Sequence, residues 1–301
     1  MIKEDVLNCF GERLREILQR EDWKNINEIR IRTGRALILR SGGKELYMDS
    51  AGIMTDEFKK ALKAEKSDID EIINMISDYS LYAFTSQLKE GFITVPGGHR
   101  AAVAGSAVIG KEGITTIKNI SSISLRIASE RKGCAKELVK RLFSDGLKNT
   151  LIVSPVCGGK TTMLRDILRI LSDSGYTVGI SDERGEIAAC YMGIPQLDVG
   201  ERTDVLDCCP KAEGLSMLIR TMSPDIVAAD EIGSKEDIAA IRQAGLCGSY
   251  VICTAHGNDI DSIKKRFVDT VIFDRYVFLE GRNCPGRVRA VYGRGGELLW
   301  Q

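Results

Sequence analysis

A short turn of small residues, placed between an apolar run and a helix-like run, constrains this chain more than any other feature. The apolar run at 151–153 ends at Ser154, the turn carries Gly158 and Gly159, and Leu164 begins a series of leucines and isoleucines at helical spacing. This order of strand, turn and helix is typical of a phosphate-binding loop, in which backbone N–H groups at the start of a helix surround an anion. An α/β protein that binds a nucleotide is therefore expected.

The turn resembles the pattern G-x-x-x-x-G-K-[ST], which binds the phosphates of nucleoside triphosphates. Lys160 is expected to reach the β- and γ-phosphates, and the Thr161 hydroxyl group is expected to bind Mg²⁺. Serine stands at position 154, where the pattern has its first glycine. An ordinary strand-to-helix turn that contains G-K-T by chance is the alternative. The expected phosphate-binding residues are Ser154, Pro155, Val156, Cys157, Gly158, Gly159, Lys160, Thr161 and Thr162.

Composition and charge argue against several classes of protein. Lysine and arginine together number 42, as do aspartate and glutamate, so the formal net charge is zero and does not indicate a nucleic-acid partner. No apolar run approaches the roughly 18 residues of a membrane span, and no signal-peptide core is seen, so a cytoplasmic protein without direct membrane insertion is expected. The nine cysteines lack a C-x-x-C spacing, which favours reduced thiols over a zinc site or disulfides.

The length of 301 residues suggests two domains. A smaller α+β domain is expected over residues 1–134, with its polar linker at 129–133. From residue 135 to residue 301, apolar runs alternate with helix-like stretches, which predicts an α/β domain with a mostly parallel sheet and crossover helices.

The first domain is expected to combine helices with paired strands. An apolar stripe at residues 3–20 predicts a helix, and residues 56–79 predict two helical pieces that break near Ser67-Asp68. Strands of this domain are predicted near residues 29–32 and 37–39, on both sides of Pro96-Gly97-Gly98, and at 123–127.

In the second domain, three predicted strands end in polar residues. One strand ends at Asp182-Glu183, the next at Asp230-Glu231, and the third at His256. Because the carboxyl ends of parallel strands meet at one edge of a sheet, these side chains are expected to line one crevice. Helices are predicted at 135–145, directly after the turn, and near 258–268, and strands at 150–154, 177–182, 225–230, 250–255, 271–279, 287–292 and 298–300.

The run I-V-A-A-D-E at 226–231 has the form of a Walker B strand, in which small buried apolar residues precede two acids. Asp230 is expected in the Mg²⁺ shell, and Glu231 is expected to orient and deprotonate the attacking water. His256 would sense the γ-phosphate or couple hydrolysis to motion. The alternatives are acids at a strand end by chance, acids that cap a helix at 182–183, and a surface histidine.

Phosphoryl transfer needs positive charge near the transferring group, so an arginine of this chain or of a neighbouring copy is expected at the site. Arg220, shortly before the Walker B strand, is the first candidate for a catalytic arginine, and Arg202 lies between two acidic strand ends. Each of the candidates could instead be an exposed solubilising side chain. The other candidates are Arg30, Arg32, Arg100 and Arg126.

Taken together, these motifs resemble those of the ATPases of type II and type IV secretion systems, with their Walker A, Asp box, Walker B and His box. That resemblance rests on the turn at 154–161, D-E-R-G-E at 182–186, R-T-M-S-P-D at 220–225, D-E at 230–231 and T-A-H-G at 254–257. More narrowly, nearly the whole chain resembles the stage III sporulation protein AA family. That narrower resemblance rests on G-G-H-R at 97–100, I-S-S-I-S-L-R-I at 120–127, S-D-E-R-G-E-I at 181–187, the run at 199–214 and S-P-D-I-V-A-A-D-E-I-G at 223–233.

The resemblance implies a RecA-like P-loop ATPase domain over residues 135–301 that binds ATP and Mg²⁺. It further implies a homo-oligomeric, hexameric ring on the cytoplasmic side of a membrane channel or export complex during sporulation, in the mother cell of a spore former. The partners would be membrane proteins of that complex. By family motif, the phosphate and Mg²⁺ ligands would be Lys160 and Thr161, the Walker B acids Asp230 and Glu231, the Asp-box acid Glu183 and the His-box residue His256.

Two other functions stay open at this point. The first is a nucleotide-gated scaffold with negligible hydrolysis, which background turnover alongside tight ATP binding would favour. The second is a nucleic-acid motor or loader on the same core, which salt-dependent binding of DNA or RNA would favour.

Overall fold

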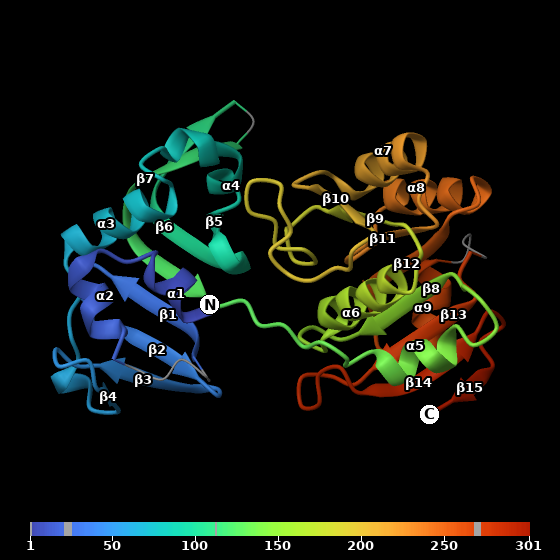
Figure 1. The fold of residues 1–301 in the computed structure, drawn as a ribbon, viewed down its shortest axis with the longest axis horizontal. Helices are drawn as coiled ribbons and strands as arrows, with labels where there is room; N and C mark the ends of the chain where they lie inside the picture. The colour runs from blue at the N-terminus through green and yellow to red at the C-terminus, as the bar shows by residue number, and fades with distance from the viewer. Residues whose placement is uncertain (1, 21–25, 112, 268–271) are drawn as a thin grey trace. The chain divides into compact units, whose positions relative to one another are not determined.

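The computed structural model describes residues 2–20, 26–111, 113–267 and 272–301. Contacts divide the chain into two compact units, Met1–Ser129 (unit 1) and Glu130–Gln301 (unit 2). In Figure 1, unit 1 runs from blue to green and unit 2 from green to red. None of the described helices combines the length and the apolar character needed to cross a bilayer.

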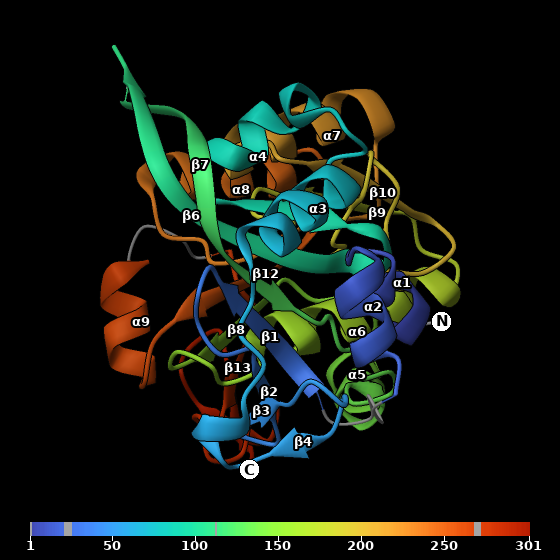
Figure 2. The ribbon, with the colours of Figure 1, turned by 90° about the vertical axis from the view of Figure 1, so that its left-hand side faces the viewer.

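Unit 1 is built on an antiparallel sheet of seven strands in the order β4-β3-β2-β1-β7-β6-β5. Helices α3 and α4 pack against β7, as Figure 2 shows. The turn at Pro96-Gly97-Gly98 joins β5 to β6, as predicted. The strands are β1 Ile26–Arg32, β2 Ile38–Ser41, β3 Lys44–Met48, β4 Met54–Thr55, β5 Phe92–Val95, β6 His99–Gly110 and β7 Gly113–Arg126.

The single helix predicted over residues 3–20 is wrong, because the chain forms two short helices, α1 (Ile2–Leu7) and α2 (Glu12–Leu18). Gly11 precedes α2 in an extended conformation with ψ 168°, which interrupts the helix. A Cβ at this position would meet the Glu71 side chain of α3 (Lys66–Ile76), so Gly11 lies close to that helix. The apolar stripe itself is buried, as expected.

The first of the two helical pieces predicted at 56–79 is also wrong. Apart from one 3-10 turn at Phe58–Lys60, the segment before α3 is not helical, and residues 61–64 form bridges with the chain between β1 and β2 and just after β3. The N–H of Leu62 donates to the Met48 carbonyl at 2.7 Å, and Ala64 accepts from Gly34. These backbone partners outweigh a weak local preference for helix. The second piece is confirmed as α3, and unit 1 also contains α4 (Thr85–Lys89).

Unit 2 contains an eight-stranded sheet in the order β10-β9-β11-β12-β8-β13-β14-β15. Every pair from β10 to β13 is parallel, and β14 and β15 add antiparallel strands, so the predicted mostly parallel sheet is confirmed. The first residue of the strand predicted at 271–279 lies outside the described residues, and the observed strand β13 begins at Arg275. The strands are β8 Thr150–Ser154, β9 Val178–Asp182, β10 Thr203–Asp207, β11 Ile226–Ala229, β12 Tyr250–His256, β13 Arg275–Leu279, β14 Val288–Gly293 and β15 Leu298–Trp300.

Strand β10 is an addition that the sequence did not predict. It pairs only with β9 in the described sheet, and its residues are half-buried or exposed. A half-buried edge strand of five residues lacks the continuous apolar run that marks the inner strands of a parallel sheet. Two strands, rather than one, therefore separate α6 from β11 along the chain.

Helices cover both faces of the unit 2 sheet (Figure 1). Because side chains alternate along a strand, Ile152 packs with α5 and α6, whereas Leu151 and Val153 pack with α7, α8 and α9. These two apolar layers make the β8 strand completely buried. The helices are α5 Lys136–Leu142, α6 Lys160–Asp173, α7 Lys211–Met222, α8 Lys235–Leu246 and α9 Ile260–Arg266.

Candidate functional site

The carboxyl ends of four neighbouring strands, β9, β11, β12 and β8, define the candidate site. The strands are parallel, so each ends at the same edge of the sheet, and β12 pairs His256 directly with Ser154 of β8. The loops that follow β8 and β11 carry Lys160 and Glu231 to this edge. The structure therefore brings Lys160, Glu231 and His256 together, although they are far apart in the sequence.

These three side chains form a continuous series of polar contacts. Lys160 Nζ lies 3.1 Å from His256 Nδ1, and His256 Nε2 lies 2.8 Å from Glu231 Oε1. An ammonium group only donates, so Nδ1 accepts and the imidazole carries its proton on Nε2, which donates to Glu231. Burial holds the pKa of Lys160 below its usual value, while the nearby carboxylates Asp230 and Glu231 act against this shift. His256 thus links the lysine to the acid.

Two hydroxyl groups hold Asp230. Thr161, in the first turn of α6, donates to Asp230 Oδ2 at 2.5 Å, and Thr254 of β12 donates to Oδ1. Thr254 Oγ1 also accepts the N–H of Glu231 at 2.9 Å. Glu231 has φ 54°, a left-handed conformation that residues other than glycine rarely adopt, so Thr254 helps to hold a strained turn. The sequence assigned no role to Thr254, although it belongs to the T-A-H-G motif.

The turn between β8 and α6 packs closely against the connection from β13 to β14. The N–H of Gly286 donates to the carbonyl of Gly158 at 2.8 Å. A Cβ at Gly158 would collide with the Ser154 hydroxyl group, and one at Gly159, where φ is 86°, would lie 2.8 Å from the Gly286 nitrogen. Ser154 is buried, and its hydroxyl group donates to the Pro155 carbonyl at 2.8 Å. A serine at position 154 is therefore accommodated because residue 158 is glycine.

Backbone donors are available at the start of α6. Among the described residues, no protein acceptor binds the N–H groups of Gly159, Lys160 and Thr161. Val156 and Cys157 are exposed in the same turn, and Thr162 is half-buried behind it. Open N–H groups at a helix start, together with a lysine, form a site that favours a bound anion.

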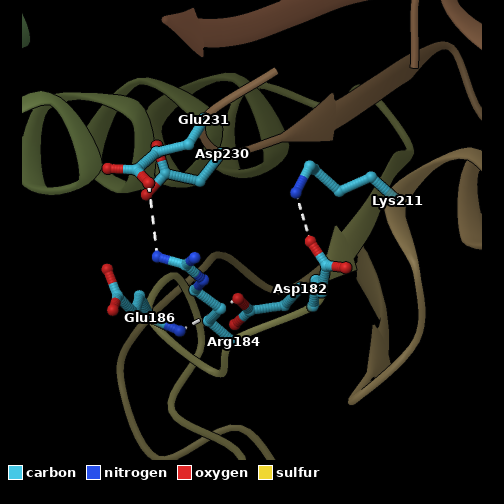
Figure 3. A pocket seen from close by; sticks show the side chains of 7 residues that line it. Asp182, Arg184, Glu186, Lys211, Asp230 and Glu231 are labelled. Carbon is cyan, nitrogen blue, oxygen red and sulfur yellow. Dashed lines mark hydrogen bonds and ion pairs between the residues drawn. The ribbon is translucent and has the colours of Figure 1, made fainter. Parts of the chain in front are cut away.

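A cavity of about 60 Å³ lies beside Asp230 and Glu231 (Figure 3). Glu183, the predicted Asp-box acid, reaches this cavity and pairs with Lys211 of α7. Arg184 Nη1 lies 3.5 Å from Glu231 Oε2. A cavity of this size holds a few water molecules or a phosphoryl group but not a nucleoside. Its lining residues are Asp182, Glu183, Arg184, Glu186, Lys211, Asp230 and Glu231.

Asp182 fixes the segment that follows β9. Its carboxylate accepts three backbone N–H groups, from Glu186 at 2.9 Å, Ile187 at 3.0 Å and Ala188 at 2.8 Å. Arg165, buried in α6, donates to the carbonyls of Glu186 and Ile187. The segment between β9 and Ala188 is thereby attached to both the sheet and the helix that begins at Lys160.

The buried carboxyl group of Asp182 leads to a prediction on pH dependence. Burial raises its pKa from 3.8 to about 6, and the three N–H donors act against this shift. A carboxyl group whose pKa rises on folding binds a proton more tightly in the folded state. Its contribution to the free energy of unfolding is therefore fully present below about pH 4 and falls by about 3 kcal/mol as the pH rises through 6.

The measurement is a ¹³C NMR titration of the aspartate carboxyl carbons. One signal should titrate with a midpoint near pH 6 and should be missing from Asp182→Asn. If the variant keeps that signal, or if every aspartate titrates below about pH 5, the assignment to Asp182 is wrong.

The structure does not bring Arg220 to this site, and a catalytic role for it within one copy finds no support. Helix α7 runs from the carboxyl end of β10 to the amino end of β11, so its last turn lies at the opposite edge of the sheet. There Arg220 Nε donates to the Ser216 carbonyl on its own helix at 3.3 Å. Arg202 precedes β10 and lies at the same opposite edge. The remaining arginine candidates belong to unit 1.

Oxygen donors suited to a magnesium ion are present beside the helix start. The Thr161 hydroxyl group and the Asp230 carboxylate are in contact. Within the described part of the chain, no group of three or more histidine, cysteine, aspartate or glutamate side chains could hold a metal ion. Mg²⁺ commonly takes one or two protein oxygens and completes its shell with phosphates and water. The pair therefore fits Mg²⁺ that binds together with a nucleotide.

Comparisons with known proteins add the following. The family model for sporulation stage III, protein AA, matches residues 1–299. Stage III sporulation protein AA of Bacillus subtilis (strain 168) is 37% identical over 309 residues, which cover 99% of this chain and 95% of that protein. The X-ray structure of the Legionella pneumophila ATPase DotB matches with a TM-score of 0.55 at 18% identity, over 88% of this chain and 75% of that chain. The crystal structure of the pilus retraction motor PilT with bound ADP matches with a TM-score of 0.57 at 14% identity, over 87% of this chain and 76% of that chain.

The two solved structures are similar to this chain in fold. Their sequence identities of 18% and 14% support a shared fold alone. One of them is an ATPase and the other a pilus retraction motor, and their similarity in fold confirms the predicted α/β fold. The sequence matches extend over almost every residue of the chain. This chain belongs to the sporulation stage III, protein AA, family.

Proposed function

We propose that this protein is a Mg²⁺-dependent ATPase that powers or assembles a membrane channel or export complex during sporulation. The observation that supports it most is the contact series from Lys160 through His256 to Glu231, beside the Thr161–Asp230 pair. Together these residues offer a phosphate-binding cation, a metal-binding pair and a general base at one edge of a parallel sheet.

Each group has a defined task in this proposal. Lys160 and the N–H groups at the start of α6 bind the β- and γ-phosphates, and the turn from Ser154 to Gly159 surrounds them. Thr161 and Asp230 would hold Mg²⁺, which when bound neutralises charge on the phosphates. Glu183, which lines the same cavity as Glu231, adds a further carboxylate.

Glu231 acts as the general base. It takes a proton from a water molecule as the water oxygen forms a bond to the γ-phosphorus, and the bond from that phosphorus to the β–γ bridging oxygen breaks. ADP and inorganic phosphate are the products. Thr254 positions the base, because its hydroxyl group contacts both Asp230 and the backbone of Glu231.

We infer that the active form is a ring, with six copies as the expected number, on the cytoplasmic side of a membrane and attached to it through partner proteins. The similarity in fold to the ATPase DotB and to the pilus retraction motor PilT supports a motor role. Membership of a sporulation family supports a role in spore formation. The membrane proteins of the complex would be the partners.

The test combines the ATPase rate with the mass of the particle at increasing protein concentration, with and without ATP. A rate per copy that rises with concentration, in step with a shift from single copies to a ring, is the expected result. A rate at the buffer background in every oligomeric state would contradict the proposed activity.

A nucleotide-gated scaffold is the second candidate, and one observation favours it. Glu231 already contacts His256 and Arg184 through its two carboxylate oxygens, and Lys160 contacts His256, so the base and the lysine are engaged with protein partners. Tight ATP binding together with background turnover of the assembled protein would select the scaffold over the motor.

A further inference from the structure

Arg184 is the one arginine among the described residues that line the cavity of unit 2. It follows Asp182 and Glu183 directly, and its side chain extends toward Glu231 (Figure 3). The turn beneath it is fixed, because the N–H of Gly185 donates to the Asp182 carbonyl at 3.3 Å and the Asp182 carboxylate holds the residues beyond. The guanidinium group of Arg184 can therefore change position by side-chain rotation while the backbone of the residue stays in place.

The charges around the cavity point to the same residue. Five carboxylates and two basic side chains line it. One of the basic residues, Lys211, is paired with Glu183, and only 15% of its side chain is exposed. Arg184 is 67% exposed, and its contact with Glu231 is long at 3.5 Å. Such an exposed ion pair contributes little to stability, so an incoming phosphate can take the place of Glu231 as the partner of Arg184.

We propose that Arg184 of each copy contacts the γ-phosphoryl group bound in the same copy and stabilises its charge during transfer. The inference rests on the proposed ATPase function and names the arginine that this function needs. Lys160 and Arg184 lie at the two ends of the contact series that passes through His256 and Glu231. A bound triphosphate offers both cations stronger acceptors than a shared carboxylate and an imidazole.

The movement also changes the base. When Arg184 and Lys160 turn toward the phosphates, the Glu231 carboxylate loses the guanidinium neighbour at Oε2, and that oxygen becomes available to a water molecule. The water then loses its proton to Glu231 while its oxygen bonds to the γ-phosphorus and ADP leaves. A guanidinium group suits this task, since its planar fork can bind two phosphate oxygens at once, whereas a lysine offers one point charge.

The experiment compares Arg184→Ala and Arg184→Lys with the wild type in ATP turnover and in binding of Mg-ADP with and without fluoroaluminate, which mimics the transferring phosphoryl group. For Arg184→Ala we expect kcat to fall on the order of 10³-fold, with ADP affinity within about threefold and the tighter binding given by fluoroaluminate lost. Arg184→Lys should recover part of kcat. Arg242→Ala, which removes an exposed arginine on α8, is the control and should behave as the wild type.

Mixing two inactive variants tests whether the arginine acts within its own copy. If Arg184 and Glu231 serve the same copy's nucleotide, a mixture of Arg184→Ala and Glu231→Gln stays inactive. Recovery of turnover in the mixture would show that a neighbouring copy supplies the arginine, and it would overturn the proposal. So would a kcat of Arg184→Ala within about threefold of the wild type, or equal losses of ADP and ADP-fluoroaluminate binding. Absence of turnover in the wild-type ring overturns the ATPase function, and the role of Arg184 with it.

Discussion

Lys160→Ala should lose ATP turnover completely and should bind ATP on the order of 10²–10³-fold more weakly than the wild type. The lysine is almost fully buried beside the helix start, so the alanine variant leaves the phosphates without their nearest side-chain cation. The N–H groups of the turn stay in place, which is why some residual binding is expected. Titration with a fluorescent ATP analogue gives the affinity, and phosphate release gives the rate.

The chain offers a matched control for this variant. Lys235 begins α8 after a parallel strand, as Lys160 begins α6, but it is exposed and does not line the cavity. Lys235→Ala should bind and hydrolyse ATP as the wild type does. Unchanged ATP affinity in Lys160→Ala, in a variant with the thermal stability of the wild type, would show that the turn after β8 does not bind the phosphates.

Glu231→Gln should bind ATP as tightly as the wild type but turn it over about 10²–10⁴-fold more slowly. Glutamine keeps the shape of the side chain and can still accept the Nε2–H of His256, so the contact series survives. It cannot take up a proton from water. Thr254 also still receives the N–H of residue 231, so the strained backbone turn is kept.

Single-turnover kinetics with bound ATP separate the chemical step from nucleotide binding in this variant. Glu236→Gln, in the exposed first turn of α8, is the control for loss of one negative charge nearby and should leave the rate unchanged. A Glu231→Gln protein that hydrolyses ATP at the wild-type rate would remove Glu231 from the chemistry. If both proteins hydrolyse ATP only at the buffer background, the result would favour the nucleotide-gated scaffold.

The strand predictions that the structure confirms depend on apolar patterns within short segments of the sequence. Ile152, Val227 and Ile252 lie in continuous apolar runs, and each run forms an inner strand of the parallel sheet. The helix stripe at residues 3–20 is buried as expected, but the helix breaks at Gly11, which has an extended backbone and lies against the side chain of Glu71, 60 residues away along the chain. The segment at 61–64 is not helical because its backbone groups pair with residues 33–37 and 48–49.

The site shows the same division. Lys160, Glu231 and His256 could be singled out because each directly follows an apolar strand, and parallel strands carry their ends to a common edge. Arg184 stands among acids and carries no signal of its own in the sequence, since its orientation depends on the turn that Asp182 and Arg165 hold. Nearness in sequence to Asp230 favours Arg220, but the crossover helix α7 runs back along the sheet and leaves Arg220 at the opposite edge.

The sequence by itself determined the order of strand, turn and helix, the parallel character of the sheet and the identity of the polar strand ends. These depend on apolar spacing and turn residues, which act between near neighbours along the chain. Only the tertiary structure decided that His256 joins Lys160 to Glu231, that Thr254 holds both acids of the β11 turn, and which arginine faces the cavity. Those contacts join residues from different strands, and their partners are fixed by the order in which the strands pair and not by their order along the chain.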